Sequence, residues 1–291
     1  EASADGTSVL VREPVAAGAA VRAAGEDIRT GQLVFEPGTQ LGPGHLGVLA
    51  SLGMLQARVH PRPRVGVLST GDELVEGPAK LQPGQIRDSN RVALLALIEQ
   101  AGCVGVDLGL VRDTEPAITA AIEHGVAECD ALVTSGGVSM GAFDYVKVVL
   151  DRLGDMRWMQ VAIRPAKPLA FGTVDGVPVF GLPGNPVSSM VSFELFARPA
   201  LRKMMGVPRA HWVRRPVRAV ADEPMRRRSD GKTHFNRVVA EHGDDGRIHV
   251  RSAGGQGSHQ LFAMANAAAL AVIPDGEGVD AGEMVDVLLL D

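Results

Sequence analysis

The sequence predicts an α/β protein built on a central, doubly wound sheet of mainly parallel strands. Between residues 61 and 206, short apolar segments alternate with longer segments whose apolar residues recur at helical spacing. This alternation is typical of a parallel sheet with helices on both faces. From 207 to 291 the helical spacing is lost and short strand-like segments follow one another, which predicts a C-terminal all-β domain resembling a barrel or sandwich.

Residues 1–60 predict a mixed region that ends at a proline-rich linker. Apolar runs at 9–15 and 33–35 indicate strands, with Gly and Pro between them. Leucines at helical spacing indicate a helix over 44–55. The chain begins abruptly, as if inside an element. We therefore expect residues 1–60 to be the remnant of an elongated mixed domain and of a small β domain, with the true N-terminus missing.

Each later element is predicted from its own local pattern. Pro116 suits the first turn of a helix, and Asp88 or Ser89 suits the N-cap of the preceding one. The strands predicted in the central domain are 64–68, 104–111, 131–134, 158–163 and 177–182. The helices predicted there are 89–101, 115–128, 145–153 and 187–205. In the C-terminal domain the predicted strands are 213–220, 234–240, 247–251, 268–273 and 284–290.

Composition excludes several classes of partner. A net charge of −5 and an aromatic content of 4% disfavour nucleic acid and anionic membranes. Cys103 and Cys129 have no metal-type spacing and indicate buried thiols in a reducing compartment. No signal peptide is visible, and the most apolar window, 261–273, is too short to span a bilayer. We expect a cytoplasmic protein without membrane or nucleic-acid partners.

Three turns at strand ends are the strongest local signals. They lie at 69–74, 134–141 and 182–189, each between a predicted strand and a following segment. Glycines in such turns allow backbone N–H groups to converge on an anion, and ligands of open α/β sheets bind at this edge. The alternative is a tight connection without a ligand. The turn residues that we expect to bind are Thr70, Gly71, Ser135, Gly136, Gly137, Ser139, Gly184 and Asn185.

Charged residues accompany these turns. Asp72, Glu73, Asp88, Asp113 and Asp144 follow strands or glycine turns, where each could cap a helix and where together they could hold Mg²⁺. Arg164 and Lys167, bracketed by prolines, suit an oxyanion; the alternative is a solvated turn. No Ser-His-Asp pattern is apparent, so the predicted chemistry is the handling of phosphate-like anions with a divalent metal rather than acyl transfer.

Together these motifs resemble the molybdopterin molybdenumtransferase family, which includes bacterial MoeA and the E domain of gephyrin. The resemblance covers nearly all of residues 9–291. It rests on GEDI at 25–28, STGDEL at 69–74, GQIRDSN at 84–90, RD at 112–113, SGGVSMG at 135–141 with Asp144 and Tyr145, PAKP at 165–168 and LPGNPVS at 182–188.

The resemblance implies the molybdopterin-binding fold and a transferase of molybdenum cofactor biosynthesis. Such a transferase inserts molybdate into adenylylated molybdopterin and releases AMP in the presence of Mg²⁺. The implied catalytic residues are Asp27, Glu73, Asp113 and Asp144, of which the last three would hold the metal. Pro183 and Pro186 match a proline pair of the pterin turn, and Arg164, Lys167 and Ser188 match positions that contact molybdate.

The resemblance also implies a homodimer with contacts to the molybdopterin adenylyltransferase and to molybdoenzyme acceptors. Gln160 stands where a bacterial relative has lysine, and Arg164 replaces another lysine, so one positive charge is lost and one is kept. Two alternatives stay open: a non-catalytic, gephyrin-like interaction scaffold, and the adenylyltransferase itself. The segments 1–60 and 207–291 disfavour the adenylyltransferase, which ends after a single α/β domain.

Overall fold

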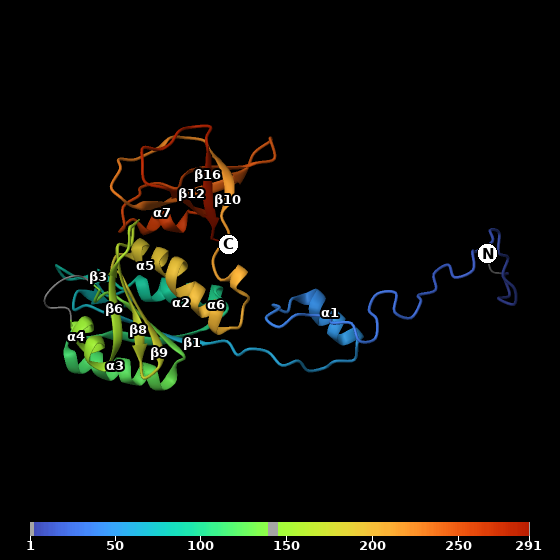
Figure 1. Cartoon of the computed structure of the whole chain (residues 1–291), viewed down its shortest axis with the longest axis horizontal. Coiled ribbons are helices and arrows are strands. Elements are labelled where there is room, and N and C mark those ends of the chain that lie inside the picture. The colour runs from blue at the N-terminus through green and yellow to red at the C-terminus, as the bar shows by residue number, and fades with distance from the viewer. Residues whose placement is uncertain (1–2, 139–144, 291) are drawn as a thin grey trace.

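The computed structural model describes residues 3–138 and 145–290. Figure 1 shows a helix-covered central sheet beneath a smaller C-terminal sheet, with the residues before β1 extending away from both. The C-terminal sheet packs against a helix of the central domain through a shared core in which Ile163, Val187 and Phe235 are buried together. These packed sheets form the body of the molecule.

The central sheet has six strands in the order β4-β1-β5-β9-β8-β6. The first four run parallel, whereas β8 pairs antiparallel with both β9 and β6. The predicted parallel-type sheet is therefore confirmed, with an antiparallel edge that the sequence analysis did not predict. The strands are β1 (Arg64–Thr70), β4 (Val104–Val111), β5 (Ala131–Ser135), β6 (Gly154–Gln160), β8 (Pro168–Val174) and β9 (Val177–Leu182).

The antiparallel edge arises because residues 154–174 supply two strands to the central sheet, where the sequence analysis predicted one. The strand predicted at 158–163 instead starts at Gly154 and ends at Gln160, and β8 was missed. Alternate residues of β6 are exposed because it lies at the edge of the sheet. Edge strands of this kind lack the continuous apolar run that marks a strand buried on both faces.

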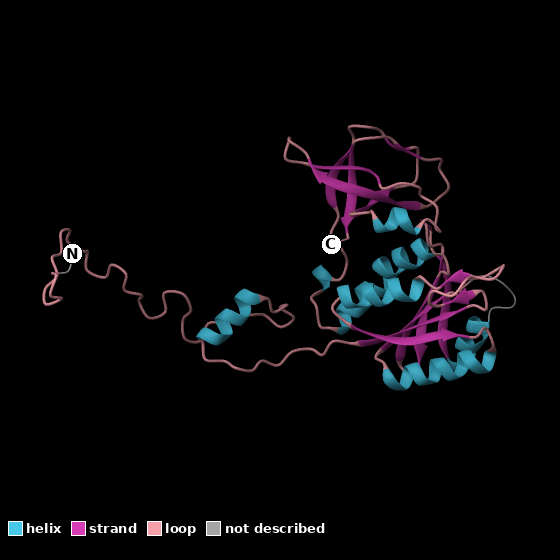
Figure 2. Ribbon diagram, turned by 180° about the vertical axis from the view of Figure 1, so that it is seen from behind, coloured by secondary structure: helices cyan, strands magenta, loops and turns pink. Residues whose placement is uncertain are grey.

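Helices cover both faces of the central sheet, as predicted (Figure 2). Successive residues of a strand point to opposite faces. Val67 of β1 accordingly belongs to the core with Leu94 of α2, and Leu68 belongs to the core with Ile118 of α3 and Val149 of α4. The helices are α2 (Asn90–Gln100), α3 (Glu115–Glu128), α4 (Tyr145–Leu153), α5 (Pro186–Ser192) and α6 (Arg198–Met204).

The long helix predicted at 187–205 is interrupted by a π-helical turn over Phe193–Ala197. Glu194 lies in this turn with its side chain 3% exposed, and its Oε2 atom is 2.7 Å from Nε of Arg214. Arg214 also donates hydrogen bonds to the carbonyl oxygens of Leu289 and Leu290. The interrupted helix thus carries a buried ion pair that ties it to the last strand of the C-terminal sheet.

The C-terminal sheet confirms the predicted all-β region. Its strands follow the order β13-β10-β16-β14-β12, and β12 also pairs with β13, which closes a barrel. A five-residue helix, α7 (Leu261–Ala265), was not predicted because it is too short to show a helical period. The strands are β10 (Val217–Ala221), β12 (Thr233–His242), β13 (Ile248–Ser252), β14 (Ala269–Ile273) and β16 (Met284–Leu289), with the short pair β11 (Met225–Arg226) and β15 (Gly278–Val279).

One short strand of the central region belongs to the barrel. β7 (Ile163–Arg164) pairs parallel with β12, with Ile163 opposite Thr233 and Arg164 opposite His234. The chain between β6 and β8 therefore joins the second sheet for two residues before it returns to the first. This exchange fixes the two sheets relative to each other.

The strands predicted at 9–15 and 33–35 are wrong. These residues form no strand, and Val9 and Val15 are 68% and 73% exposed. A strand needs a neighbour to satisfy its backbone groups, and no sheet of the described residues extends alongside this segment. The predicted helix exists as α1 (Pro43–Ser51), which ends earlier than expected and buries no residue. No helix in the described ranges has the length and apolar character needed to cross a membrane.

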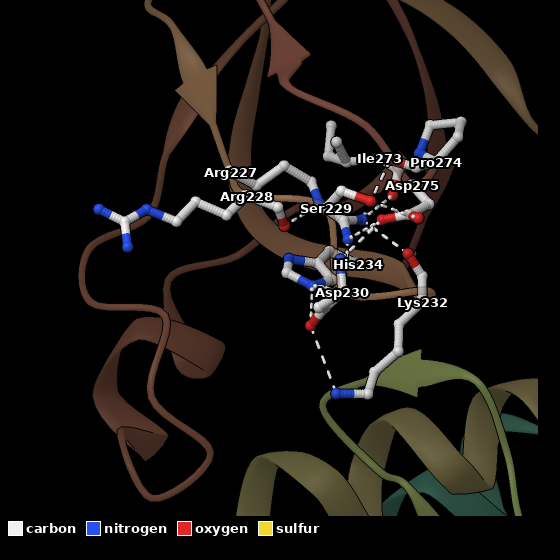
Figure 3. Close-up of polar contacts among 9 residues, drawn as sticks. All are labelled: Arg227, Arg228, Ser229, Asp230, Lys232, His234, Ile273, Pro274 and Asp275. Carbon is white, nitrogen blue, oxygen red and sulfur yellow. Dashed lines mark hydrogen bonds and ion pairs between the residues drawn. The ribbon is translucent and has the colours of Figure 1, made fainter.

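A buried arginine holds the loop that leads into β12 (Figure 3). The Arg227 side chain is 4% exposed, and its Nη1 atom donates to the carbonyl oxygens of Lys232, Ile273 and Pro274. Its Nη2 atom pairs with Asp230 and with Asp275, at 2.7 Å from the latter. Arg227 therefore determines where β12 begins and, through β12, where β7 is held.

We predict that Arg227→Met lowers the free energy of unfolding by about 2–3 kcal/mol, because several charge-assisted hydrogen bonds are lost from a buried position. Urea unfolding at neutral pH measures the change. The control is Arg228→Met, since Arg228 is exposed and extends away from this cluster in Figure 3. Equal stability of the two variants would show that Arg227 does not anchor the loop.

Candidate functional site

A cleft of about 610 Å³ lies at the edge where β1, β5 and β9 end. The strand register sets Ser69 beside Ser135 and Ser135 beside Leu182, so the three turns start at the same level. The volume falls within the range of roughly 300–1,000 Å³ that is usual for small-molecule sites. The predicted residues that line this cleft are Thr70, Gly71, Glu73, Asp113, Ser135, Gly136, Gly137, Pro183, Gly184, Asn185, Pro186 and Ser188.

Other predicted residues lie elsewhere. Ser139 and Asp144 fall outside the described residues. Asp27 lies in the N-terminal segment, in a separate hollow that it shares with Arg22 and Ser51. The cleft of this chain does not include Asp27, because its segment extends away from the central sheet (Figure 1).

The expected positive φ angles occur in the turns. Gly136 and Gly137 have φ angles of +93° and +71°, and Gly71 has +148°. A Cβ atom at Gly137 would lie 2.3 Å from Cβ of Val146, and one at Gly71 would lie 2.7 Å from Oε2 of Glu73. Glycine is required at both positions, since a side chain would displace the start of α4 or the Glu73 carboxylate.

Asn90 joins two of the turns directly. From the first turn of α2, its Nδ2 atom donates to Oγ of Ser135 at 2.8 Å and to the carbonyl oxygen of Gly184 at 2.7 Å. The backbone N–H of Gly136 also donates to the carbonyl oxygen of Leu182 at 3.1 Å. The β5 and β9 turns are therefore one connected wall of the cleft. Sequence reasoning missed this role of Asn90, because nothing in the sequence shows which turns face α2.

Two carboxylates face the cleft and could hold a metal. Glu73 and Asp113 both line it. Oδ1 of Asp72 accepts a hydrogen bond of 3.3 Å from the backbone N–H of Asp113, which connects the ends of β1 and β4. Across residues 3–138 and 145–290, no three His, Cys, Asp or Glu side chains gather closely enough to hold a metal by themselves. Mg²⁺ is commonly bound by one or two carboxylates together with substrate phosphates, and this pair fits that requirement.

Asp88 stabilises the start of a helix, which was the structural alternative to metal binding for each of these acidic residues. Its side chain is 1% exposed, its Oδ2 atom lies 3.0 Å from Nε of Arg91, and its Oδ1 atom accepts from the backbone N–H of Arg91 at 3.3 Å. Oγ of Ser69 also donates to Asp88. Arg91 pairs further with Asp107 and Glu76. Asp88 is therefore a neutralised anchor for the start of α2 rather than a free ligand.

The proline-bracketed cations lie at the junction of the two sheets. Lys167 is exposed and precedes Pro168, which lines the cleft; Arg164 is exposed on β7. The carbonyl oxygen of Lys167 accepts from the backbone N–H of Val161 at 2.7 Å. Ala166 between them is buried with a φ of +79°, a conformation that is strained for a residue with a Cβ atom. The turn is thus held in one shape by its surroundings.

Arg237 is a cation that sequence reasoning missed. It lies on β12 with 1% exposure, and its Nη2 atom donates to the carbonyl oxygens of Gly255 and Gly257. Its Nε atom is buried without a hydrogen-bond partner among the described residues, and burial lowers the pKa of its guanidinium. The same loop reaches the β9 turn, because the backbone N–H of Val187 donates to the carbonyl oxygen of Ser258. A lone arginine in a predicted strand carries no sequence signal of this placement.

Three regions of the chain match known protein families. Residues 1–53 match the MoeA N-terminal region (domain I and II), and residues 66–203 match a probable molybdopterin binding domain. Residues 218–290 match the MoeA C-terminal region (domain IV). The match to the molybdopterin binding domain covers the central sheet and the turns that line the cleft.

Curated relatives and solved structures agree with these matches. The chain is 38% identical to the molybdopterin molybdenumtransferase of Haemophilus influenzae over 92% of its own length and 66% of that protein. It is 36% identical to molybdopterin molybdenumtransferase 1 of Mycobacterium tuberculosis, over 97% of its own length and 67% of that protein. The MoeA protein of Pyrococcus horikoshii superposes with a TM-score of 0.76 at 31% identity, covering 92% of this chain and 64% of that one. The chain thus spans about two thirds of the length of these relatives.

We predict that Asn90→Ala lowers the free energy of unfolding by about 1–2 kcal/mol and accelerates amide exchange at Gly136, because two hydrogen bonds between the turns are lost. Urea unfolding and hydrogen exchange measure the two effects. Asn266→Ala is the matched control, since Asn266 is exposed and makes one hydrogen bond within its own helix end. Unchanged exchange at Gly136 in Asn90→Ala would contradict the connection.

Proposed function

Because the chain belongs to the molybdopterin molybdenumtransferase family, we propose that it transfers molybdenum to molybdopterin in molybdenum cofactor biosynthesis. The observation that carries this proposal is the single cleft formed by the β1, β5 and β9 turns, which holds most of the predicted binding residues. A cleft of this size, lined by both polar and apolar residues, suits a ligand with a ring system and phosphate groups. Soluble molybdate would enter from the junction between the sheets.

Adenylylated molybdopterin is the pterin substrate that the cleft favours. Gly137 and the Gly184–Asn185 turn line the cleft next to the polar side chains of Thr70 and Ser188, and we propose that their backbone N–H groups bind the substrate. Such turns suit the oxygens of a phosphoanhydride, and their fixed geometry requires no rearrangement when charge shifts during its cleavage. In that cleavage a water oxygen would bond to phosphorus as the bridging P–O bond breaks, which leaves AMP and the phosphate of molybdopterin as products.

Glu73 and Asp113 would hold Mg²⁺ together with phosphate oxygens of the substrate, with Asp144 proposed as a further ligand. The metal would neutralise charge on the phosphates when bound. The chain positions the carboxylates through Gly71, which leaves space for Glu73, and through Asp72, which binds the backbone of Asp113. These contacts hold both carboxylates at the sheet edge before any ligand arrives.

Molybdate is a tetrahedral oxyanion, and we assign it to the cations at the junction of the sheets. Arg164 and Lys167 supply charge on a constrained turn, Ser188 supplies a hydroxyl at the start of α5, and Arg237 supplies a buried guanidinium. A buried guanidinium without a carboxylate partner is stabilised by an anion of this kind. The pterin nucleotide and the oxyanion would therefore share Ser188, whereas the cations at the junction are assigned to the oxyanion.

A homodimer is the assembly that we propose. Its support is the row of exposed apolar side chains along the N-terminal segment, among which Leu55 is 94% exposed. In such a dimer, Asp27 would act in catalysis only if the assembly places its N-terminal segment against a cleft. Contacts with the adenylyltransferase and with molybdoenzyme acceptors, and a cytoplasmic location, stay predictions.

The direct test is a calorimetric titration of the protein with AMP and Mg²⁺, followed by measurement of AMP release from adenylylated molybdopterin on addition of molybdate. Binding is the first readout because Asp27 lies away from the cleft, so turnover of this chain is expected to be slow. AMP release that depends on molybdate supports the proposal. Absence of both binding and release would refute it.

Glu73→Gln should remove most of the gain in AMP affinity that Mg²⁺ produces in the parent protein, because a carboxamide is a much poorer ligand for this ion. Titrations with and without Mg²⁺ measure the gain. Glu241→Gln is the control, since Glu241 is an exposed residue of β12 outside the cleft. An equal gain in Glu73→Gln and the parent would contradict the proposed metal role.

Lys167→Ala should raise the molybdate concentration for half-maximal AMP release by about tenfold or more, as expected for the loss of one charged contact, while the affinity for AMP stays within twofold. Lys203→Ala on α6 provides the control for loss of an exposed lysine. Weaker AMP binding with an unchanged molybdate dependence would assign Lys167 to the nucleotide instead.

A further inference from the structure

Arg87 is the cation that lines the cleft itself. Among the described residues that form the cleft wall, it is the one Lys or Arg, whereas Glu73 and Asp113 bring negative charge. The third acid of the wall, Asp88, is already neutralised by Arg91. Among the described wall residues, a phosphate group that enters this cleft therefore meets the carboxylates of Glu73 and Asp113 and the positive charge of Arg87.

The backbone holds Arg87 in a fixed relation to Glu73. Arg87 ends β3 (Ile86–Arg87), which pairs parallel with β2 (Leu74–Val75) directly after Glu73. The backbone N–H of Ile86 donates to the carbonyl oxygen of Glu73 at 2.8 Å. The short β2–β3 pair thus places Glu73 and Arg87 on the same wall of the cleft.

The hydrogen bonding of Arg87 is incomplete. Its Nη2 atom donates to the carbonyl oxygen of Ala79, which fixes the guanidinium plane. Its Nη1 atom is buried and has no hydrogen-bond partner in the described part of the chain. A buried donor of a charged group without a partner is costly, and a ligand oxygen would remove that cost.

We propose that Arg87 binds the phosphate of the adenylyl group and so makes the cleft selective for a phosphorylated nucleotide over its nucleoside. This inference rests on the proposed function and extends it. Arg87 would balance the negative charge of the phosphate from the β3 side of the cleft, while backbone N–H groups of the β5 and β9 turns would bind the phosphate from the other side. Guanidinium groups suit phosphate because several N–H groups can bind its oxygens in one plane.

The test compares AMP with adenosine, which differ in the phosphate alone. Calorimetric titrations in Mg²⁺ buffer would use the parent protein, Arg87→Met, Arg87→Lys and the control Arg218→Met. Arg218 is an exposed residue of β10 outside the cleft, with its side chain 61% exposed. We expect Arg87→Met to weaken AMP binding by roughly ten- to a hundredfold and to leave adenosine binding unchanged, with Arg87→Lys between the parent and Arg87→Met.

Two results would overturn the proposal while the parent still binds AMP: equal AMP affinity in Arg87→Met and the parent, or an equal loss of affinity for AMP and adenosine. The second result would show that Arg87 shapes the cleft and does not bind phosphate. Thermal unfolding of each variant verifies that it is folded. Failure of the parent itself to bind AMP would overturn the proposed function and, with it, this assignment.

Discussion

The register of β1, β5 and β9 is the constraint on which the rest of the structure depends. Because Ser69, Ser135 and Leu182 lie side by side, the chain leaves three neighbouring strands at one level. Backbone N–H groups, glycines and carboxylates from segments far apart in sequence then face a common space. Asn90 strengthens this arrangement, since it binds both the β5 and the β9 turn from the start of α2.

The start of α2 is itself held by buried charge. Asp88 and Arg91 form an ion pair with side-chain exposures of 1% and 7%, and this pair lies immediately beside Asn90. Breaking one partner of such a pair leaves an uncompensated charge in a dry environment. The cleft wall is therefore supported by electrostatic contacts behind it as well as by the strand register.

The second sheet adds groups that the central sheet does not have. β7 leaves the central region to pair with β12, and Arg227 fixes the point at which β12 begins. These contacts hold Arg164 and the buried Arg237 on the barrel side of the junction, with Lys167 beside the cleft. A chain with a net charge of −5 thus still carries cations on the segments where we propose the oxyanion site, which the whole-molecule charge does not reveal.

The sequence by itself determined the elements whose signals are local. β4, α3, α4 and β9 begin and end at the predicted residues, because each has a clear apolar period or a buried apolar run. The strand-end turns were also predictable, since Gly71, Gly136 and Gly137 are needed for positive φ angles. The lining residues of the glycine turns follow from those turns and from the rule that ligands bind at the carboxyl ends of parallel strands, whereas Pro183, Pro186 and Ser188 were expected from the family resemblance.

Tertiary structure alone decided what depends on distant partners. The runs at 9–15 and 33–35 have strand-like composition, yet they form no strand because no strand of the described sheets lies beside them to pair with. β7 exists because it pairs with β12, about 70 residues away in the sequence. Glu194, in the π-helical turn, pairs with Arg214, which lies outside that helix. The partners of Asn90 come from two turns distant in sequence, and only the packed structure shows that Arg87 Nη1 and Arg237 Nε are buried without a hydrogen-bond partner among the described residues.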